Sequence, residues 1–156
     1  MKKLRFAIFG NTYQAKKSAC IEQLLGILLE RGASLLIDRQ FYEYLTDKLG
    51  ILVTPEALIE GNDFHADFVI SMGGDGTFLE AARRVGDKGM PILGINMGRL
   101  GFLSDYQAED IASAIDHIYN DTYRIEERTV LMVEKDGDDI QGYPYALNEV
   151  AVLKHD

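Results

Sequence analysis

One short segment of the chain, Gly73-Gly74-Asp75-Gly76-Thr77, combines the residue types that phosphate chemistry needs. Glycines permit positive φ angles and leave backbone N–H groups open to a ligand's phosphates. Asp75 is the unusual member, because a carboxylate repels a phosphate unless a divalent metal ion or a proton-transfer role makes it useful. The segment therefore suggests phosphoryl transfer. The alternative is an ordinary strand-to-helix turn with Asp75 as an exposed cap, since short glycine motifs also match by chance.

The residues on either side of this segment predict a strand before it and a helix after it. Phe68–Met72 is a mainly apolar run of strand length that stops at a glycine pair, as buried parallel strands do. Thr77 and Glu80 form the Thr-x-x-Glu pattern of a capping box, which predicts that a helix starts at Thr77 and runs to about Arg84. We expect the N-terminus of this helix to face Gly73–Gly76.

The rest of the N-terminal part alternates between strand and helix patterns. Apolar strands are expected at residues 4–10, 35–37 and 90–96. Asp38 is expected to cap a helix, and Thr54-Pro55 to start a short helical turn. Apolar residues recur at helical spacing in three segments, which contain Ile21, Leu24, Leu25 and Leu28, then Phe41, Leu45 and Leu49, and then Ile111, Ala114, Ile115 and Ile118.

Alternating strands and helices predict an α/β fold with a parallel, doubly wound, Rossmann-like sheet. Such sheets bind ligands beyond the carboxyl ends of their strands. Gly73–Gly76 and Asn96–Gly101 both lie there, so the two loops are expected to face one crevice. The turn after the first strand, Gly10–Ala15, lacks the G-x-G-x-x-G fingerprint. A dehydrogenase that holds its dinucleotide at that first turn is therefore disfavoured.

The pattern changes near residue 121, where helical spacing stops. Residues 129–135 and 145–153 are rich in β-branched and aromatic residues, and the polar Asp136–Asp139 between them is typical of a hairpin turn. We therefore expect an α/β nucleotide-binding domain at 1–121 and the start of a C-terminal all-β domain at 122–156. Two or three strands do not make an independent antiparallel domain, so the chain is expected to be a truncated piece of a longer protein.

The composition argues against several classes of protein. The chain has 156 residues, of which 47% are hydrophobic, and a net charge of −9 with no basic run, which argues against binding to nucleic acid or to an anionic membrane. No stretch is long enough to span a bilayer. The single cysteine, Cys20, excludes a disulfide framework and fits a reducing cytoplasm. His65, His117 and His155 have no metal-ligand spacing, so no metal site made by the protein is expected.

Three motifs of this chain resemble those of one enzyme family. Gly73–Thr77, Asn96-Met97-Gly98-Arg99-Leu100-Gly101-Phe102-Leu103 and Asn148-Glu149-Val150 are similar, in order and spacing, to the successive motifs in the N-terminal half of NAD kinases. The first motif is shared with phosphofructokinases and with diacylglycerol and sphingosine kinases, and the other two narrow the resemblance. The resemblance implies a phosphofructokinase/NAD kinase-like fold. It also implies transfer of a phosphoryl group from ATP, or another donor, to the 2′-hydroxyl of the adenosine ribose of NAD, which makes NADP.

The resemblance further implies roles for single residues. Asp75 becomes the proton acceptor for the 2′-hydroxyl, and Gly74, Gly76 and Thr77 lie beside the phosphates. A divalent cation, Mg²⁺, is implied as the companion of the polyphosphate donor. Phe102 is a candidate for stacking on the nucleotide, although a phenylalanine after a strand is more often a core residue.

Asn148 and Glu149 are the remaining candidates for substrate binding. They are expected inside an otherwise apolar strand, where an amide and a carboxylate are costly unless they have polar partners. Ribose hydroxyls and an adenine edge are suitable partners. The alternative is that the two residues lie on the solvent side of an edge strand.

Two rival functions remain open at this stage. One is a phosphofructokinase-like or lipid kinase that uses the same loop, although a lipid kinase is expected to carry basic or apolar membrane-docking features that this acidic chain lacks. The other is a non-catalytic module that binds NAD or ATP. The later Thr-Gly-Ser-Thr-Ala-Tyr-like segment of the family does not occur in the chain. Residues 1–156 alone are therefore expected to be inactive, and the full-length protein is expected to be an active homo-oligomer.

Overall fold

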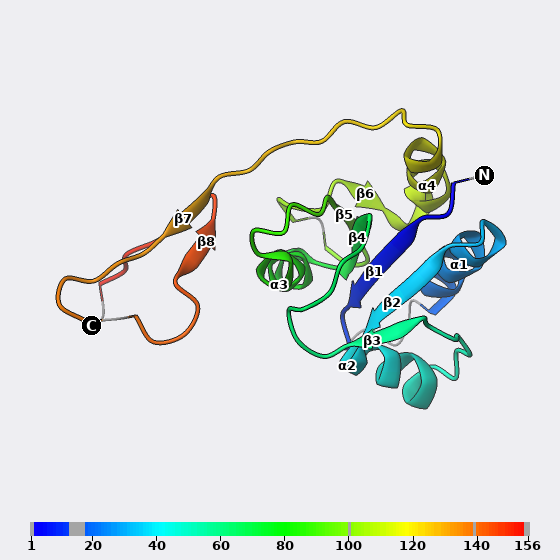
Figure 1. The fold of residues 1–156 in the computed structure, drawn as a ribbon, viewed down its shortest axis with the longest axis horizontal. Helices are drawn as coiled ribbons and strands as arrows, with labels where there is room; N and C mark the ends of the chain where they lie inside the picture. Colours follow the sequence, from blue (N-terminus) through cyan, green and yellow to red (C-terminus); the bar gives the residue numbers. More distant parts are fainter. Residues whose placement is uncertain (1, 13–17, 100, 139, 155–156) are drawn as a thin grey trace. The chain divides into compact units, whose positions relative to one another are not determined.

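The computed structural model describes residues 2–12, 18–99, 101–138 and 140–154 and contains two compact units, residues 1–123 and 124–156 (Figure 1). The first unit is built on one sheet of six parallel strands in the order β3-β2-β1-β4-β5-β6. The strands are β1 (Arg5–Gly10), β2 (Ser34–Asp38), β3 (Ala57–Ile59), β4 (Phe68–Gly73), β5 (Ile92–Asn96) and β6 (Tyr106–Gln107).

This strand order makes the sheet doubly wound. The chain runs outward from β1 to β3, returns to the centre at β4 and runs outward again to β6. The direction of winding therefore reverses between β1 and β4, and the carboxyl ends of those two strands form the topological switch point where doubly wound sheets bind ligands. The predicted α/β, Rossmann-like class is confirmed.

Helices cover both faces of the sheet. They are α1 (Ser18–Glu30), α2 (Arg39–Glu43), which continues as a π-helix (Tyr44–Lys48), α3 (Asp75–Val85), and a short 3₁₀ turn (Ala108–Asp110) that leads into α4 (Ile111–Tyr119). One core cluster joins Phe6 and Ile8 of β1 to α1, α2 and α4. The opposite cluster joins Ala7 and Phe9 of the same strand to Ala81 of α3. The central strands are thus apolar on both sides, as in parallel sheets with two covered faces.

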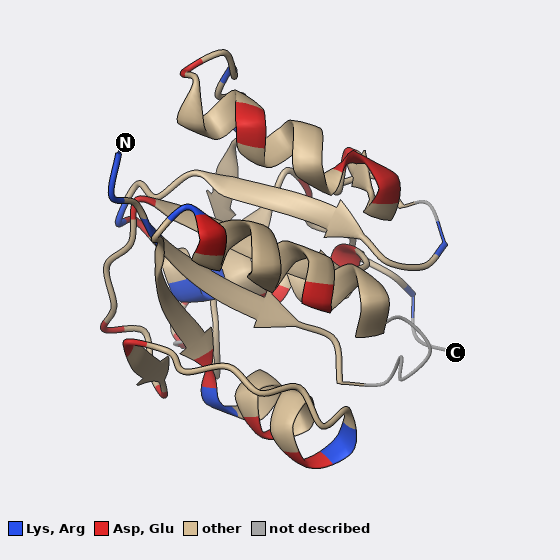
Figure 2. Ribbon diagram, turned by 90° about the vertical axis from the view of Figure 1, so that its right-hand side faces the viewer, with Lys and Arg blue, Asp and Glu red and all other residues tan. Residues whose placement is uncertain are grey.

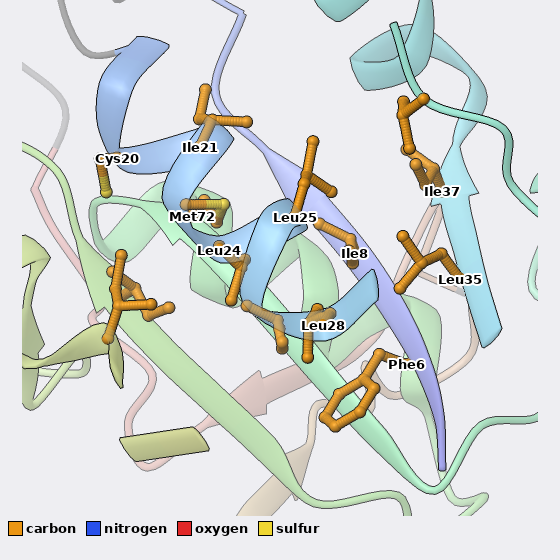
Figure 3. Packing of buried hydrophobic residues seen from close by; sticks show 14 of the residues in the cluster. Phe6, Ile8, Cys20, Ile21, Leu24, Leu25, Leu28, Leu35, Ile37 and Met72 are labelled. Atoms are coloured by element: carbon orange, nitrogen blue, oxygen red, sulfur yellow. The ribbon is translucent and has the colours of Figure 1, made fainter. Parts of the chain in front are cut away.

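Helix α1 shows how the sequence pattern becomes packing (Figure 3). The predicted apolar positions Ile21, Leu24, Leu25 and Leu28 are all buried, and they meet Phe6, Ile8, Leu35, Ile37 and Met72 of the sheet. Gly32 follows with φ +68°, a conformation that glycine adopts without cost. The predicted cap of α2 is also present, because the Asp38 carboxylate accepts a hydrogen bond from the Phe41 N–H at 3.3 Å.

Three local predictions were wrong. Helix α3 begins at Asp75 with Gly74 as its N-cap, so Thr77 lies inside the first turn and makes no cap hydrogen bond. Residues 54–55 start no helical turn; the chain there leads into the short strand β3. Edge strand β6 was missed, because a strand of two residues has no alternation to detect.

The second unit is a small antiparallel pair. Strand β7 (Val130–Met132) pairs with β8 (Tyr145–Leu147), and both strands are shorter than predicted. A separate tight turn links Lys135 to Asp138, while the last residue of the predicted hairpin turn, Asp139, lies outside the described residues. This unit fits the predicted first strands of a β domain.

Charged residues of the first unit lie mainly on its helices and loops, and its central strands carry almost none (Figure 2). In the whole sequence, acidic residues outnumber basic ones by 25 to 16. The basic residues visible in Figure 2 are scattered and form no cluster. None of the helices among the described residues is long and apolar enough to cross a membrane.

Candidate active site

The candidate site is built at the carboxyl end of β4, where α3 begins. Gly73 ends the strand, Gly74 caps the helix with φ −105°, and Asp75 is the first helical residue. Beside it, the Asn11 N–H, just after β1, donates to the Met72 carbonyl at 2.9 Å. The glycine segment therefore lies at the switch point between β1 and β4, with the positive end of the α3 dipole directed at it.

The glycines of this segment do not use the positive φ angles that glycine permits, because Gly73, Gly74 and Gly76 are absent from the positive-φ residues of the described chain. A Cβ on Gly73 would lie 2.9 Å from the Thr77 Cβ, which is too close, and 3.2 Å from the Asn11 Cβ, which is a tight contact. A Cβ on Gly74 or Gly76 would meet nothing within 4 Å. The first glycine is required by packing, and the other two leave open space over the helix N-terminus.

Asp75 is held by the second motif. Its carboxylate accepts hydrogen bonds from the Phe102 N–H, at 3.0 Å to Oδ2 and 3.2 Å to Oδ1, and from the Leu103 N–H, at 3.1 Å to Oδ1. The carboxylate therefore turns away from the N–H groups at the start of its own helix. Those N–H groups have no partner within the helix and stay available to an anion. The predicted meeting of the two loops is confirmed.

Asn96 folds the second loop back onto the site. Its side chain is 2% exposed, its Oδ1 accepts from the Gly98 N–H at 2.8 Å, and its Nδ2 donates to the Arg99 carbonyl at 2.8 Å. The Met97 N–H also donates to the Gly73 carbonyl at 3.1 Å. These bonds join the end of β5 directly to the glycine segment. Asn96 was not predicted as a site residue, although a polar residue at the carboxyl end of a buried strand was the available signal.

The other predicted site residues are more exposed. Thr77 is half-buried beside Gly73. Phe102 is 92% exposed, so the alternative that it is a core residue is wrong. Asn148 and Glu149 belong to the second unit, are exposed, and follow β8 instead of lying inside it as predicted. Asn148 has φ +67°, and its N–H donates to the Thr129 carbonyl at 2.8 Å. These two residues thus sit on a turn at the end of a strand.

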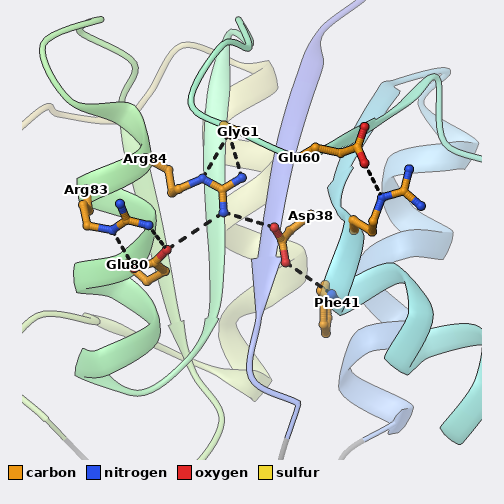
Figure 4. A network of polar contacts seen from close by, with 8 residues as sticks. Asp38, Phe41, Glu60, Gly61, Glu80, Arg83 and Arg84 are labelled. Atoms are coloured by element: carbon orange, nitrogen blue, oxygen red, sulfur yellow. Dashed lines mark hydrogen bonds and ion pairs between the residues drawn. The ribbon is translucent and has the colours of Figure 1, made fainter.

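A network of charged residues fixes α3 against β2 (Figure 4). The Arg84 guanidinium donates to the Asp38 carboxylate at 3.2 Å and to the Gly61 carbonyl at 2.7 and 3.1 Å, and it lies 5.2 Å from the centre of the Phe9 ring. Asp38 ends β2, the strand whose carboxyl end carries the ribose-binding acid in dinucleotide-binding Rossmann domains. Here the carboxylate is paired with an arginine and caps α2, so it serves the fold.

Glu80, on the exposed side of α3, is part of the same network. Hydrogen bonds from Arg83 at 2.6 and 2.9 Å lower the pKa of Glu80 below its ordinary value of 4.5. The positive charges of Arg83 and Arg84 act in the same direction, and partial burial opposes them. The predicted capping role of Glu80 was therefore wrong, because its carboxylate is used by two arginines further along the helix.

The described residues offer no metal site of their own, because no group of three or more histidine, cysteine, aspartate or glutamate side chains gathers among them. Asp75 is the acidic residue at the switch point, and both of its oxygens already accept backbone hydrogen bonds. These residues do not form a cage for Mg²⁺, which needs near-octahedral oxygen ligands.

Known proteins identify the family. A model of the ATP-NAD kinase N-terminal domain matches residues 6–123. The chain belongs to the ATP-NAD kinase family. The NAD kinase of Bacteroides fragilis is 52% identical over 153 residues, which are 98% of this chain and 53% of that protein. The NAD kinase of Porphyromonas gingivalis is 38% identical over 156 residues, which are 100% of this chain and 53% of that protein.

A solved structure shares the fold. Yeast NADH kinase complexed with NADH superposes with a TM-score of 0.71 at 15% sequence identity, over 95% of this chain and 46% of that one. The present chain therefore spans about half the length of the two NAD kinases and of the solved structure that it matches. It holds all three motifs whose resemblance pointed to this family.

Proposed function

We propose that this protein is an NAD kinase, which transfers a phosphoryl group from ATP to the 2′-hydroxyl of the adenosine ribose of NAD and so makes NADP. The observation that carries the proposal is the placement of Asp75. Its carboxylate is fixed by the amides of Phe102 and Leu103 at the switch point, beside a helix N-terminus whose glycines leave open space. Family membership supports this assignment over other kinases that share the glycine segment.

Asp75 acts in this proposal as the proton acceptor. The ribose 2′-oxygen attacks the terminal phosphorus of the donor, a new P–O bond forms, and the bond from that phosphorus to the bridging oxygen breaks to release ADP. The hydroxyl proton passes to the Asp75 carboxylate. A sugar hydroxyl is not ionised near neutral pH, so a positioned base contributes about 10²–10⁴ in rate. Positioning of the two substrates supplies much of the remainder.

The glycine segment and Phe102 bind and orient the nucleotides in this proposal. The free N–H groups at the start of α3, at Gly76 and Thr77, attract phosphate oxygens, and the helix dipole adds to that attraction. The open space over Gly74 and Gly76 admits the phosphates. The exposed ring of Phe102 offers a face on which a base stacks.

We assign Asn148 and Glu149 to the ribose hydroxyls and the adenine edge. Both side chains are exposed, and the left-handed backbone of Asn148 presents them on a tight turn after β8. In this assignment residues 1–121 form the nucleotide-binding domain and residues 122–156 begin a β domain. We further propose a cytoplasmic homo-oligomer for the full-length protein.

Mg²⁺ enters this proposal with the donor. Because the described side chains form no cage for it, the phosphate oxygens of ATP would hold the ion, and it would screen their charge next to Asp75. The chain's own contribution is to keep the Asp75 carboxylate, the helix N-terminus and the nucleotide in one place.

The test is NADP formation by the full-length protein carrying Asp75→Asn, with Asp87→Asn as the control for removing an exposed acid after α3. Asparagine keeps an Oδ1 that accepts from Phe102 and Leu103, so the fold and NAD affinity should persist while kcat falls by about 10²–10⁴. The control should keep its kcat. Near-normal kcat for Asp75→Asn would remove Asp75 from the base role. Nucleotide binding without any phosphorylation by the wild-type protein would favour the non-catalytic module.

A further inference from the structure

We propose that Gly101 is a positioning residue for Asp75: the absence of a side chain at residue 101 is what allows the carboxylate to occupy the place from which it meets the substrate. This inference rests on the proposed function. A Cβ on Gly101 would lie 2.6 Å from the Asp75 Cγ and 2.7 Å from its Oδ2, and closer still to its Oδ1. No real Cβ approaches other atoms that closely, so any other residue at 101 displaces one of the two partners.

The loop that carries Gly101 is held firmly on both sides. Before it, Asn96 bonds to Gly98 and Arg99, and the Met97 N–H bonds to the Gly73 carbonyl. After it, Ser104 is buried and packs so tightly over Gly94 that a Cβ on that glycine would lie 2.7 Å from the Ser104 Oγ. Moving the loop would break these contacts on two strands.

The Asp75 side chain has freedom that the loop lacks. It is only half-buried, its carboxylate can move by rotation about the Cα–Cβ and Cβ–Cγ bonds, and the space over neighbouring Gly74 and Gly76 is open. A methyl group at 101 should therefore push the carboxylate out of its bonds with Phe102 and Leu103 and leave the loop and the sheet in place. The consequence is a misplaced base in an intact fold.

Gly101 thus lets the first and second motifs come into contact, because it has no side chain in the space that the Asp75 carboxylate occupies. The amides of Phe102 and Leu103 attract the carboxylate, and the bare backbone of Gly101 lets it come close enough to receive both bonds. Since positioning within about 1 Å decides about 10²-fold in rate, this arrangement acts on turnover and much less on nucleotide binding.

The experiment compares Gly101→Ala with Gly61→Ala in the full-length protein. Gly61 is an exposed glycine at which a Cβ meets nothing within 4 Å, so its variant controls for the loss of a glycine. For Gly101→Ala we expect kcat to fall about 10²-fold, with little change in the KM for NAD and a Tm within about 4 °C of wild type. The control should match wild type in all three. A Tm loss of about 10 °C or more with a parallel loss of active protein would make Gly101 a folding residue and overturn the inference.

A double variant separates this inference from the proposed function. If Gly101 acts through the carboxylate, Gly101→Ala should cause no further loss of kcat in protein that already carries Asp75→Asn. Losses that multiply would mean that Gly101 acts independently of Asp75. If Asp75→Asn is fully active, the proposed function of Asp75 fails; if Asp75→Asn is inactive while Gly101→Ala keeps its kcat, only the present inference fails.

Discussion

Replacing Arg84 by methionine tests how α3 is held in place. Arg84 lies in the last turn of the helix whose first residue is Asp75, and its side chain is 11% exposed. Its partner Asp38 is 16% exposed at the end of β2. Methionine keeps much of the packing over Phe9 and removes the charge and the hydrogen bonds to Asp38 and Gly61.

The expected loss follows from the burial of the pair. Removing one partner of a buried ion pair costs about 3–5 kcal/mol, because the other charge is left without compensation. We take the lower end, about 3 kcal/mol, since Asp38 keeps its hydrogen bond from the Phe41 N–H and some contact with solvent. For a unit of this size that loss lowers Tm by roughly 12 °C.

Arg83→Met is the matched control. Arg83 is the neighbouring residue of the same helix turn and pairs with Glu80 on the surface, where the two side chains are 39% and 48% exposed. Exposed pairs contribute less than about 1 kcal/mol. The assay is urea unfolding of both variants and wild type, with the m-values compared so that only changes in the midpoint are read as stability. Equal losses for the two variants, within about 0.5 kcal/mol, would refute the claim that the Asp38–Arg84 pair fixes α3.

Two further predictions concern the same helix. Gly76→Val should keep the Tm of wild type, because the position has open space and no positive φ. It should weaken ATP and NAD binding by at least about tenfold in calorimetric titration, because the branched side chain fills the space that the phosphates need. Unchanged affinity would show that the segment is only a turn. Glu80→Gln should lower stability only at pH values where the wild-type carboxylate is charged. The pKa of Glu80 in the folded protein lies below 4.5. The difference in free energy of unfolding between the two proteins should therefore be constant above about pH 5 and vanish as the pH falls through the folded pKa. A difference that persists at about pH 2 would assign the effect to packing.

The glycines of the site are needed for two different reasons. Gly73 and Gly101 are required because side chains of Thr77 and Asp75 occupy the space next to them, whereas Gly76 faces open space. Substitutions at the first two should disturb the chain's own residues. Substitutions at Gly76 should disturb a ligand, which is why binding and turnover measurements on these positions give different kinds of information.

Patterns of short range were sufficient for much of the fold. The spacing of Ile111, Ala114, Ile115 and Ile118 predicts α4, and all four side chains are buried, because a helix that packs on a sheet must place its apolar residues on one face. The same reasoning misplaced the start of α3. Thr77-x-x-Glu80 has the capping pattern but lies inside the helix, whereas a reciprocal cap that does form, Gln107 with Asp110, lacks a serine or threonine.

What the sequence alone determined is therefore the succession of the four central strands and the main helices, the apolar core and the glycine segment with its carboxylate, since each depends on residues within a turn or two of one another. The short edge strands β3 and β6 were not predicted. Only the tertiary structure decided which groups bind Asp75 and Arg84. Asp75 meets the Phe102 N–H, 27 residues away, and Arg84 meets Asp38, 46 residues away. Those partners depend on which strand ends lie together in the parallel sheet and on how closely two loops can approach at a glycine. Neither property produces a periodic pattern of residues in the sequence, so neither could be predicted from it.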